Sequence, residues 1–177
     1  MPKITVTEYL SLDGVFEEPG EWSFPFWTEE AAKWKLDELF AAEAQLLGRV
    51  TYEGFAAAWP TMTDEAGFAD RMNGMQKYVV SSTLTDPTWA NSKVITVGEI
   101  KDLPDENILV AGSGRLVDTL FREGLVDELR LLVHPIVLGG GKKQLFGDGL
   151  PTTSLTLEDQ QTFSSGVLAL TYRRAAA

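Results

Sequence analysis

Hydrophobic residues follow two different periods along this chain. Short segments rich in Val, Ile and Leu predict strands, and between them lie segments whose apolar residues recur at the spacing of an amphipathic helix. The predicted strands cover 3–11, 44–48, 77–82, 93–97, 107–111 and 128–138. The predicted helices begin at Glu29 and then cover 52–59, 65–75 and 115–123.

The first long helix is predicted from a cap and an apolar stripe. Thr28 is of the residue type that caps a helix N-terminus, and Glu29 and Glu30 follow it in the first turn. The segment 44–48 then carries the chain into a strand that ends at Gly48. The stripe expected to face the core consists of Leu36, Leu39, Phe40, Ala44 and Leu47.

The order of these elements predicts a fold class. Strands and helices alternate over most of the chain, which favours a largely parallel sheet flanked by helices. The last strands differ, because "LTLEDQQTF" and "VLALTYRR" are joined by the short turn "SSG" and predict an antiparallel hairpin at one edge. With no repeat and no long linker, we expect a single α/β domain over residues 1–177.

Composition excludes several classes of protein. The formal net charge is −11 and no Lys/Arg cluster stands out, which disfavours binding to nucleic acid or to an anionic membrane. No apolar segment approaches the roughly 18 residues of a membrane span, and the N-terminus lacks the features of a signal peptide. The chain has no cysteine, so we expect a cytoplasmic protein. With one histidine, His134, we expect no metal site.

The segment from Asn107 to Gly124 predicts an anion site. A buried strand runs through Gly112 and Gly114 directly into a helix, which places free backbone N–H groups and the positive end of the helix dipole together. A tight turn alone also accounts for these glycines. The dinucleotide-binding fingerprint fits poorly, because Val117 stands where its third glycine belongs.

Two further strand ends offer similar chemistry. The segment "LLGRVTYEGF" again leads an apolar strand to a glycine and an arginine, and "KYVVSS" ends in two serines. Arginine matches phosphate geometry well, so three such strand ends in one sheet suit a ligand with several phosphates. The groups concerned are Gly48, Arg49, Thr51, Tyr52, Ser81 and Ser82, together with Arg115.

Five ordered segments then resemble a known family. "SLDG", "LLGRVTYEGF", "KYVVSSTL", "ILVAGSGRLVDTLFREGLVDEL" and "HPIVLGGGKKQLF" are similar to the dihydrofolate-reductase-like family, in particular the C-terminal reductase domain of the bifunctional riboflavin-biosynthesis deaminase/reductase. The resemblance covers nearly the whole chain. It implies a dihydrofolate-reductase fold that binds NADPH and passes a hydride to a pteridine-like or aminopyrimidine substrate.

The resemblance also implies roles for the three strand ends. One side of the coenzyme phosphates would be lined by Gly48, Arg49, Thr51 and Tyr52. The 2′-phosphate would meet Ser81 and Ser82. The pyrophosphate and nicotinamide would be approached by Gly112, Ser113, Gly114, Arg115 and Leu116, with a cis peptide between the first two. A homodimer is the assembly expected.

The chain departs from the family in its acid–base residues. It has no cysteine for a deaminase zinc site, so that half of the bifunctional enzyme is excluded. Folate reductases carry a carboxylate early in their first long helix, where this chain has Glu29 and Glu30, although acidic residues there are also ordinary helix-dipole partners. Asp13 of "SLDG" is the candidate catalytic contact to the substrate, with an Asp-Gly turn as the alternative.

The loop after the first strand supplies candidate substrate residues. Trp22 and Trp27 are expected to stack on the substrate and Glu30 to contact it, although ordinary packing explains the aromatic residues equally well. We therefore predict an NADPH-dependent reductase acting on a small heterocycle. The alternative is a catalytically inactive dinucleotide-binding or interaction protein of the same fold.

Overall fold

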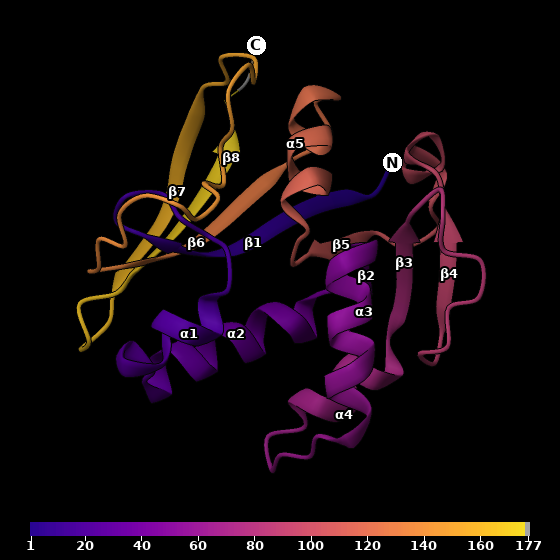
Figure 1. Cartoon of the computed structure of the whole chain (residues 1–177), viewed down its shortest axis with the longest axis horizontal. Helices are drawn as coiled ribbons and strands as arrows, with labels where there is room; N and C mark the ends of the chain where they lie inside the picture. The colour runs from indigo at the N-terminus through magenta and orange to yellow at the C-terminus, as the bar shows by residue number, and fades with distance from the viewer. Residues whose placement is uncertain (176–177) are drawn as a thin grey trace.

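A computed structural model describes residues 1–175 and contains one eight-stranded sheet with the order β4-β3-β2-β5-β1-β6-β8-β7 (Figure 1). The first six strands are mutually parallel, whereas β8 runs antiparallel to both β6 and β7. This confirms the predicted α/β class and its C-terminal hairpin edge. The strands are β1 Lys3–Ser11, β2 Ala44–Gly48, β3 Gln76–Val80, β4 Ser92–Ile95, β5 Asn107–Val110, β6 Glu128–His134, β7 Leu155–Thr162 and β8 Leu168–Arg174.

Helices cover both faces of the sheet (Figure 1). The helix α5 lies on one face, and α2, α3 and α4 lie on the other. No helix in the described part of the chain is long and apolar enough to cross a membrane. The helices are α1 Pro19–Trp22, α2 Glu29–Ala41, α3 Arg49–Ala58, α4 Phe68–Gly74 and α5 Gly114–Arg122, with short 3₁₀ turns η1 Phe24–Phe26, η2 Trp59–Thr61 and η3 Val97–Asp102.

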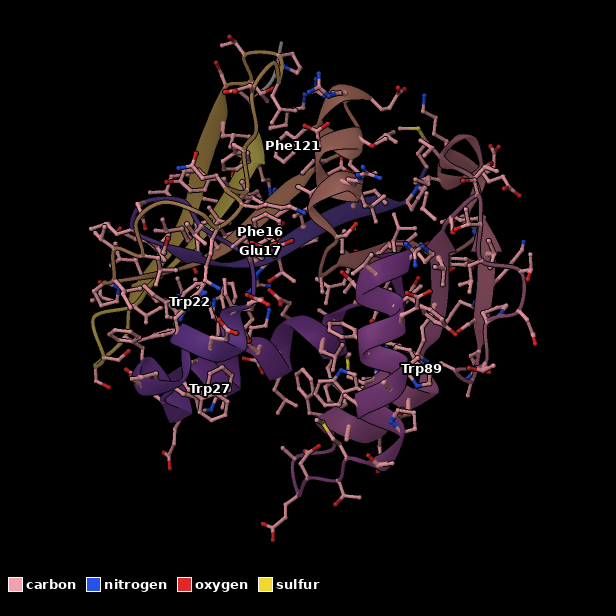
Figure 2. The ribbon with its side chains drawn as sticks, in the orientation of Figure 1. Phe16, Glu17, Trp22, Trp27, Trp89 and Phe121 are labelled. Atoms are coloured by element: carbon pink, nitrogen blue, oxygen red, sulfur yellow. The ribbon has the colours of Figure 1, made fainter. Side chains whose placement is uncertain are left out.

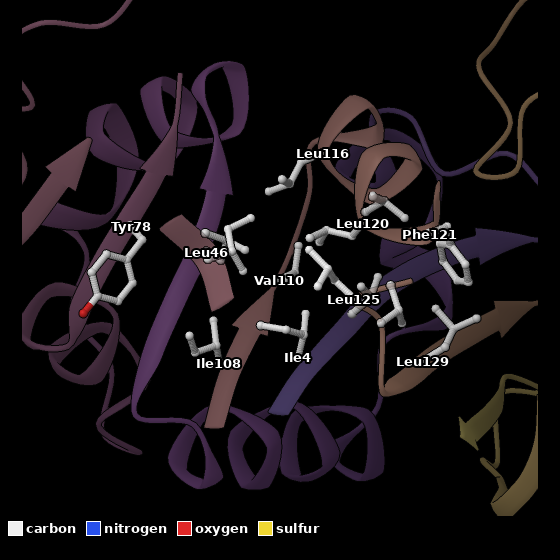
Figure 3. Packing of buried hydrophobic residues seen from close by; sticks show 14 of the residues in the cluster. Ile4, Leu46, Tyr78, Ile108, Val110, Leu116, Leu120, Phe121, Leu125 and Leu129 are labelled. Carbon is white, nitrogen blue, oxygen red and sulfur yellow. The ribbon is translucent and has the colours of Figure 1, made fainter. Parts of the chain in front are cut away.

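The larger core lies between the sheet and α5 (Figure 3). Val6 and Val110 from neighbouring strands pack with Leu120 of α5, and all three are fully buried. The next residue of β5, Leu109, joins the cluster on the opposite face, as the alternation of a strand requires. Burying each such side chain contributes roughly 1.5 to 3 kcal/mol. The strands that carry the glycine turns therefore have a rigid support on both faces.

The predicted stripe of the first long helix was partly wrong. The helix α2 ends at Ala41, and Ala44 and Leu47 belong to β2. Phe40 is 53% exposed, whereas Glu38, which the apolar pattern passed over, is buried. The stripe failed because a short strand follows this helix almost at once, and because a buried charge occupies the face turned toward the sheet.

Other boundaries moved by a few residues. Thr28 caps α2 as predicted, since its side chain accepts the Ala31 N–H. The helix expected at 52–59 begins earlier, at Arg49, and the strand expected at 128–138 stops at His134, directly before Pro135. Proline has no N–H to donate to a sheet, which explains the earlier end of that strand.

Lys77 joins three segments of the far half of the sheet. It is fully buried in β3, and its Nζ donates to the carbonyl oxygens of Asn73 at 2.8 Å, Met75 at 2.9 Å and Ala90 at 2.9 Å. The ammonium also lies 4.2 Å from the ring centroid of Trp89. One side chain thus links the end of α4 to the segment that leads into β4.

We predict that Lys77→Met destabilises the fold by about 3 kcal/mol, because three buried carbonyl groups lose their donor. Urea unfolding followed by circular dichroism measures this. Lys93→Met, at an exposed position on the neighbouring strand β4, is the matched control and should change the free energy of unfolding very little. Equal stability of the two variants would contradict the structural role of Lys77.

Candidate functional site

Two glycine turns touch at the carboxyl ends of β2 and β5. The Gly48 N–H donates to the Gly112 carbonyl oxygen at 3.3 Å. A Cβ atom on Gly48 would lie 2.2 Å from the Ser113 Oγ, and one on Gly112 would lie 2.9 Å from the Thr51 Oγ1. A Cβ atom on Gly48 would also lie 2.9 Å from the Ser113 Cβ, and Gly112 has a φ of 114°, so both positions favour glycine. The peptide bond between Gly112 and Ser113 is cis, as the family resemblance implies.

Two helices begin at these turns. Gly48 is the N-cap residue of α3 and Ser113 that of α5, and in the described chain neither makes a side-chain capping hydrogen bond. The first-turn N–H groups of both helices therefore lack the usual side-chain acceptor. Two helix dipoles with free donors at one edge of the sheet suit an extended anion better than a single small one.

The two arginines of the turns lie at the surface. Arg115 is exposed in the first turn of α5, and Arg49 is exposed in the first turn of α3. The Arg49 guanidinium pairs with Glu53 at 2.9 Å, and both side chains are accessible. Exposed ion pairs of this kind contribute little to stability, so the guanidinium can exchange its partner for a phosphate.

The end of β3 brings two serines to the same edge. Gly48 is in register with Val80, so Ser81 follows directly beside the start of α3. The Ser81 Oγ accepts the N–H groups of Thr83 at 3.1 Å and Leu84 at 3.0 Å, and it lies 3.4 Å from the Thr83 Oγ1. Its hydroxyl hydrogen can rotate from the Thr83 Oγ1 to a ligand. Ser82 is exposed. The structure therefore places both serines beside the glycine turns.

Tyr52 and Leu116 support the two glycine turns from the protein interior. Tyr52 is 2% exposed, and its hydroxyl oxygen accepts the Trp89 N–H at 2.9 Å. Leu116 is buried in the core under α5. Their side chains support the first turns of the two helices, so only their backbone groups are placed to meet a ligand.

The sheet separates next to these turns. Pairing of β1 with β5 ends at Val6 and Val110, whereas its pairing with β6 continues to Ser11. From Thr7 onward, the edge of β1 that faces β5 has no strand partner in the described chain. This open edge and the glycine turn after β5 form two sides of one separation in the sheet.

The loop after β1 crosses this separation. A Cβ atom on Gly114 would lie 2.4 Å from Cζ of the Phe16 ring, so this ring lies directly against the first turn of α5. Figure 2 shows Phe16 and Glu17 in the middle of the molecule, at the level of β1 and below α5. The Phe16 N–H donates to the Lys143 carbonyl oxygen at 3.3 Å, which ties this loop to the one after β6.

Asp13, the predicted catalytic residue, is held by three donors of its own chain. Its carboxylate accepts the Ser11 hydroxyl at 2.7 Å and the N–H groups of Leu138 at 3.1 Å and Gly139 at 2.9 Å. These donors lower the pKa of Asp13 to about 2, so it is ionised at neutral pH and has no proton to give. Asp13 joins the loops that follow β1 and β6.

The predicted substrate residues lie apart from the glycine turns. The Glu30 carboxylate accepts the N–H and the hydroxyl of Ser164 at 2.9 and 2.8 Å, in the turn between β7 and β8, and these donors lower its pKa. Trp22 is buried, and its indole N–H donates to the Glu17 carbonyl oxygen at 3.0 Å. Trp27 is 46% exposed (Figure 2). Within residues 1–175, none of the three makes a hydrogen bond to the glycine turns.

His134 is a buried structural residue. Its Nδ1 lies 2.9 Å from the Leu132 carbonyl oxygen, and burial lowers the pKa of the imidazole. Within residues 1–175, no group of three or more His, Cys, Asp or Glu side chains could hold a metal ion.

Glu8 is the site residue that the sequence patterns missed. It lies on β1, 8% exposed, and its Oε1 is buried without a hydrogen-bond partner among the described residues. Burial raises the pKa of this carboxyl from 4.5 to about 8, against a smaller lowering effect of Lys35. Glu8 is therefore protonated at neutral pH. The only signal in the sequence is an acidic residue among the inward positions of a strand.

A buried charge cluster lies under α2. The Lys35 Nζ donates to the Thr7 Oγ1 at 2.8 Å and to the Glu38 carboxylate at 2.5 Å. The Arg130 Nε lies 3.1 Å from the other Glu38 oxygen, and its guanidinium lies 4.1 Å from the Trp34 ring centroid. Two cations surround one anion here, so this cluster has one positive charge in excess.

Two surface hollows lie away from the glycine turns. One, of about 370 Å³, lies beside β4 and η3, and the other, of about 390 Å³, is lined by residues that include Ala56, Asn73 and Trp89. Neither is lined by residues of the predicted coenzyme site.

Solved structures share this fold. The chain is similar to a putative riboflavin biosynthesis protein from Shewanella sp. PV-4, with a TM-score of 0.81, 19% identity and coverage of 98% of this chain and 99% of the other. It is also similar to dihydrofolate reductase from Enterococcus faecalis, solved with NADP(H) bound, with a TM-score of 0.65, 14% identity and coverage of 98% and 97%.

Sequence comparisons identify the family. The uncharacterized protein YyaP from Bacillus subtilis (strain 168) is 32% identical over 144 residues, which are 77% of this chain and 76% of YyaP. The family model of the RibD C-terminal domain matches residues 2–169. This protein therefore belongs to the RibD C-terminal domain family.

Proposed function

We propose that this protein is an NADPH-dependent reductase acting on a small pteridine-like or aminopyrimidine heterocycle. Membership of the RibD C-terminal domain family supports a reductase. The similar structures include a riboflavin biosynthesis reductase from Saccharomyces cerevisiae and the NADP(H) complex of dihydrofolate reductase named above. The coenzyme, when bound, supplies the hydride.

The contact between the two glycine turns carries this proposal. Gly48 and Gly112 meet without side chains, and α3 and α5 both begin there without side-chain caps in the described chain. Backbone N–H groups can thus approach phosphate oxygens closely from two helices. A turn that only reversed the chain would not need a second helix N-terminus beside it. The residues present therefore fit a dinucleotide.

Each neighbouring residue has an assigned part in coenzyme binding. The N–H groups from Ser113 to Leu116 bind the pyrophosphate, and Arg49 and Arg115 supply charge. Ser81 and Ser82 donate hydroxyl hydrogens to the 2′-phosphate. Thr51, in the first turn of α3, lines one side of the coenzyme phosphates. Tyr52 fixes α3 through its bond to Trp89.

The substrate heterocycle binds in the separation between β1 and β5. Trp27 is the remaining candidate for stacking on it, because its ring is accessible. Trp22 and Glu30 are assigned to holding the loop that carries Trp27. A cytoplasmic location is in keeping with the cysteine-free composition. We also expect the protein to form a homodimer.

We predict that Arg49→Ala and Arg115→Ala each weaken NADPH binding about tenfold or more, because each removes a charge-assisted phosphate contact of about 1.5 to 3 kcal/mol. Titration of the coenzyme fluorescence measures the affinity. Lys101→Ala, which removes an exposed cation on η3, is the matched control. If the wild-type protein does not bind millimolar NADPH, the proposed function is wrong.

The serines provide a test of coenzyme choice. We predict that wild-type protein prefers NADPH to NADH and that replacing Ser81 and Ser82 together by alanine narrows this preference, since two donors to the 2′-phosphate are lost. The ratio of the two affinities, from the same titration, is the measurement. An unchanged ratio would show that the serines only shape the turn after β3.

A further inference from the structure

Glu8 lies beside the separation between β1 and β5. It stands two residues beyond Val6, the last residue of β1 that pairs with β5. The alternation of the strand places it on the face that carries Val6 and Leu10, which is the face covered by α5. The turn that begins α5 and the Phe16 ring lie across the same separation.

The surroundings of this carboxyl are unusual for an acidic residue. On β6 its pairing partner is the apolar Leu131, and Phe16 packs against the same core cluster. The charged groups that act on it, Lys35 and Glu38, both come from α2, and Tyr9 is its neighbouring phenol on β1. A buried oxygen without a hydrogen-bond partner destabilises the folded protein, so its presence here points to a ligand that supplies the missing hydrogen bond.

No acidic residue early in α2 supplies a buried carboxyl group without a partner. Glu29 and Glu30 are exposed, and Glu30 is held by Ser164 at the distant hairpin. Asp13 is ionised and accepts the Ser11 hydroxyl and two backbone N–H groups. Glu38 is also buried with an oxygen that lacks a hydrogen bond, but its carboxylate is paired with Lys35 and Arg130. The Glu8 carboxyl makes neither a hydrogen bond nor an ion pair within residues 1–175.

We propose that Glu8 is the catalytic acid that protonates the heterocycle from the floor of the separation between β1 and β5. This rests on the proposed reductase function. The hydride adds to the carbon of a ring C=N bond, the π electrons form a bond between the nitrogen and the Glu8 proton, and the carboxylate left behind regains a proton from water. The coenzyme is oxidised, and the C=N bond becomes a C–N single bond.

Lys35 makes the carboxylate state accessible. Its ammonium donates to Thr7, the residue before Glu8, and its charge favours the ionised carboxyl. Burial and the Glu38 charge act in the other direction. Glu8 can therefore hold its proton at neutral pH and still give it up when a base approaches, as a general acid must.

The first test follows the carboxyl itself in the free protein. With ¹³C-labelled glutamate carboxyl groups, the resonance absent from Glu8→Gln should titrate with a midpoint near pH 8. The stability gives a second readout. Between about pH 4.5 and 8, Glu8 is protonated in the folded protein and ionised in the unfolded chain. Its contribution to the free energy of unfolding is therefore lost as pH rises through that window. The unfolding constant of wild type relative to Glu8→Gln should rise by up to about tenfold per pH unit there.

The second test adds NADP⁺ as the probe. The Glu8 resonance should shift on binding. For the reduced pterin, folate or aminopyrimidine that best drives NADPH oxidation, Glu8→Gln should lower kcat at least about a hundredfold with little change in coenzyme affinity. The exposed Glu65→Gln is the matched control and should behave as wild type.

The outcomes separate the two proposals. If NADP⁺ and NADPH both fail to bind, the reductase function fails. The coenzymes can bind while the pKa of Glu8 is near 4.5 or its resonance does not shift on addition of NADP⁺. In that case the acid role of Glu8 is wrong and the reductase function stands. A Glu8→Gln enzyme with wild-type kcat would also overturn the acid role.

Discussion

The close approach of Gly48 to the turn at Gly112 is the constraint on which the site depends. A Cβ atom at Gly48 would lie 2.2 Å from the Ser113 Oγ and 2.9 Å from the Ser113 Cβ, so glycine favours this close approach of the ends of β2 and β5. This contact sets α3 and α5 side by side at their N-termini. Without it, two helix dipoles could not serve one dinucleotide.

The rest of the fold holds that contact from both faces. Val110 and Leu120 anchor β5 and α5 in one core, and the Tyr52 bond to Trp89 anchors α3 on the other face. On the far side of β5, β1 stays paired to β6 while its other edge opens. The same sheet thus brings together the glycine turns proposed to bind phosphate and the open edge of β1 on which the proposed acid Glu8 lies.

Features carried by local sequence could be predicted. The strands, the Thr28 cap and the glycine turns follow from residues close together in the chain. Features that depend on distant contacts could not. The loop of Asp13 meets Gly139 across 126 residues, and Glu30 meets Ser164 across 134, so neither contact has a local signal. Likewise, Glu8 becomes a neutral acid only when packing on β1 removes it from water.

We propose that the touching glycine turns bind the coenzyme. Backbone amide chemical shifts of ¹⁵N-labelled wild-type protein, recorded as NADPH is added, test this most directly. We expect the largest shifts at Gly48, Arg49 and the residues 113–116. Shifts centred on the hollow beside β4, near Lys93, or no shifts at millimolar NADPH, would contradict it.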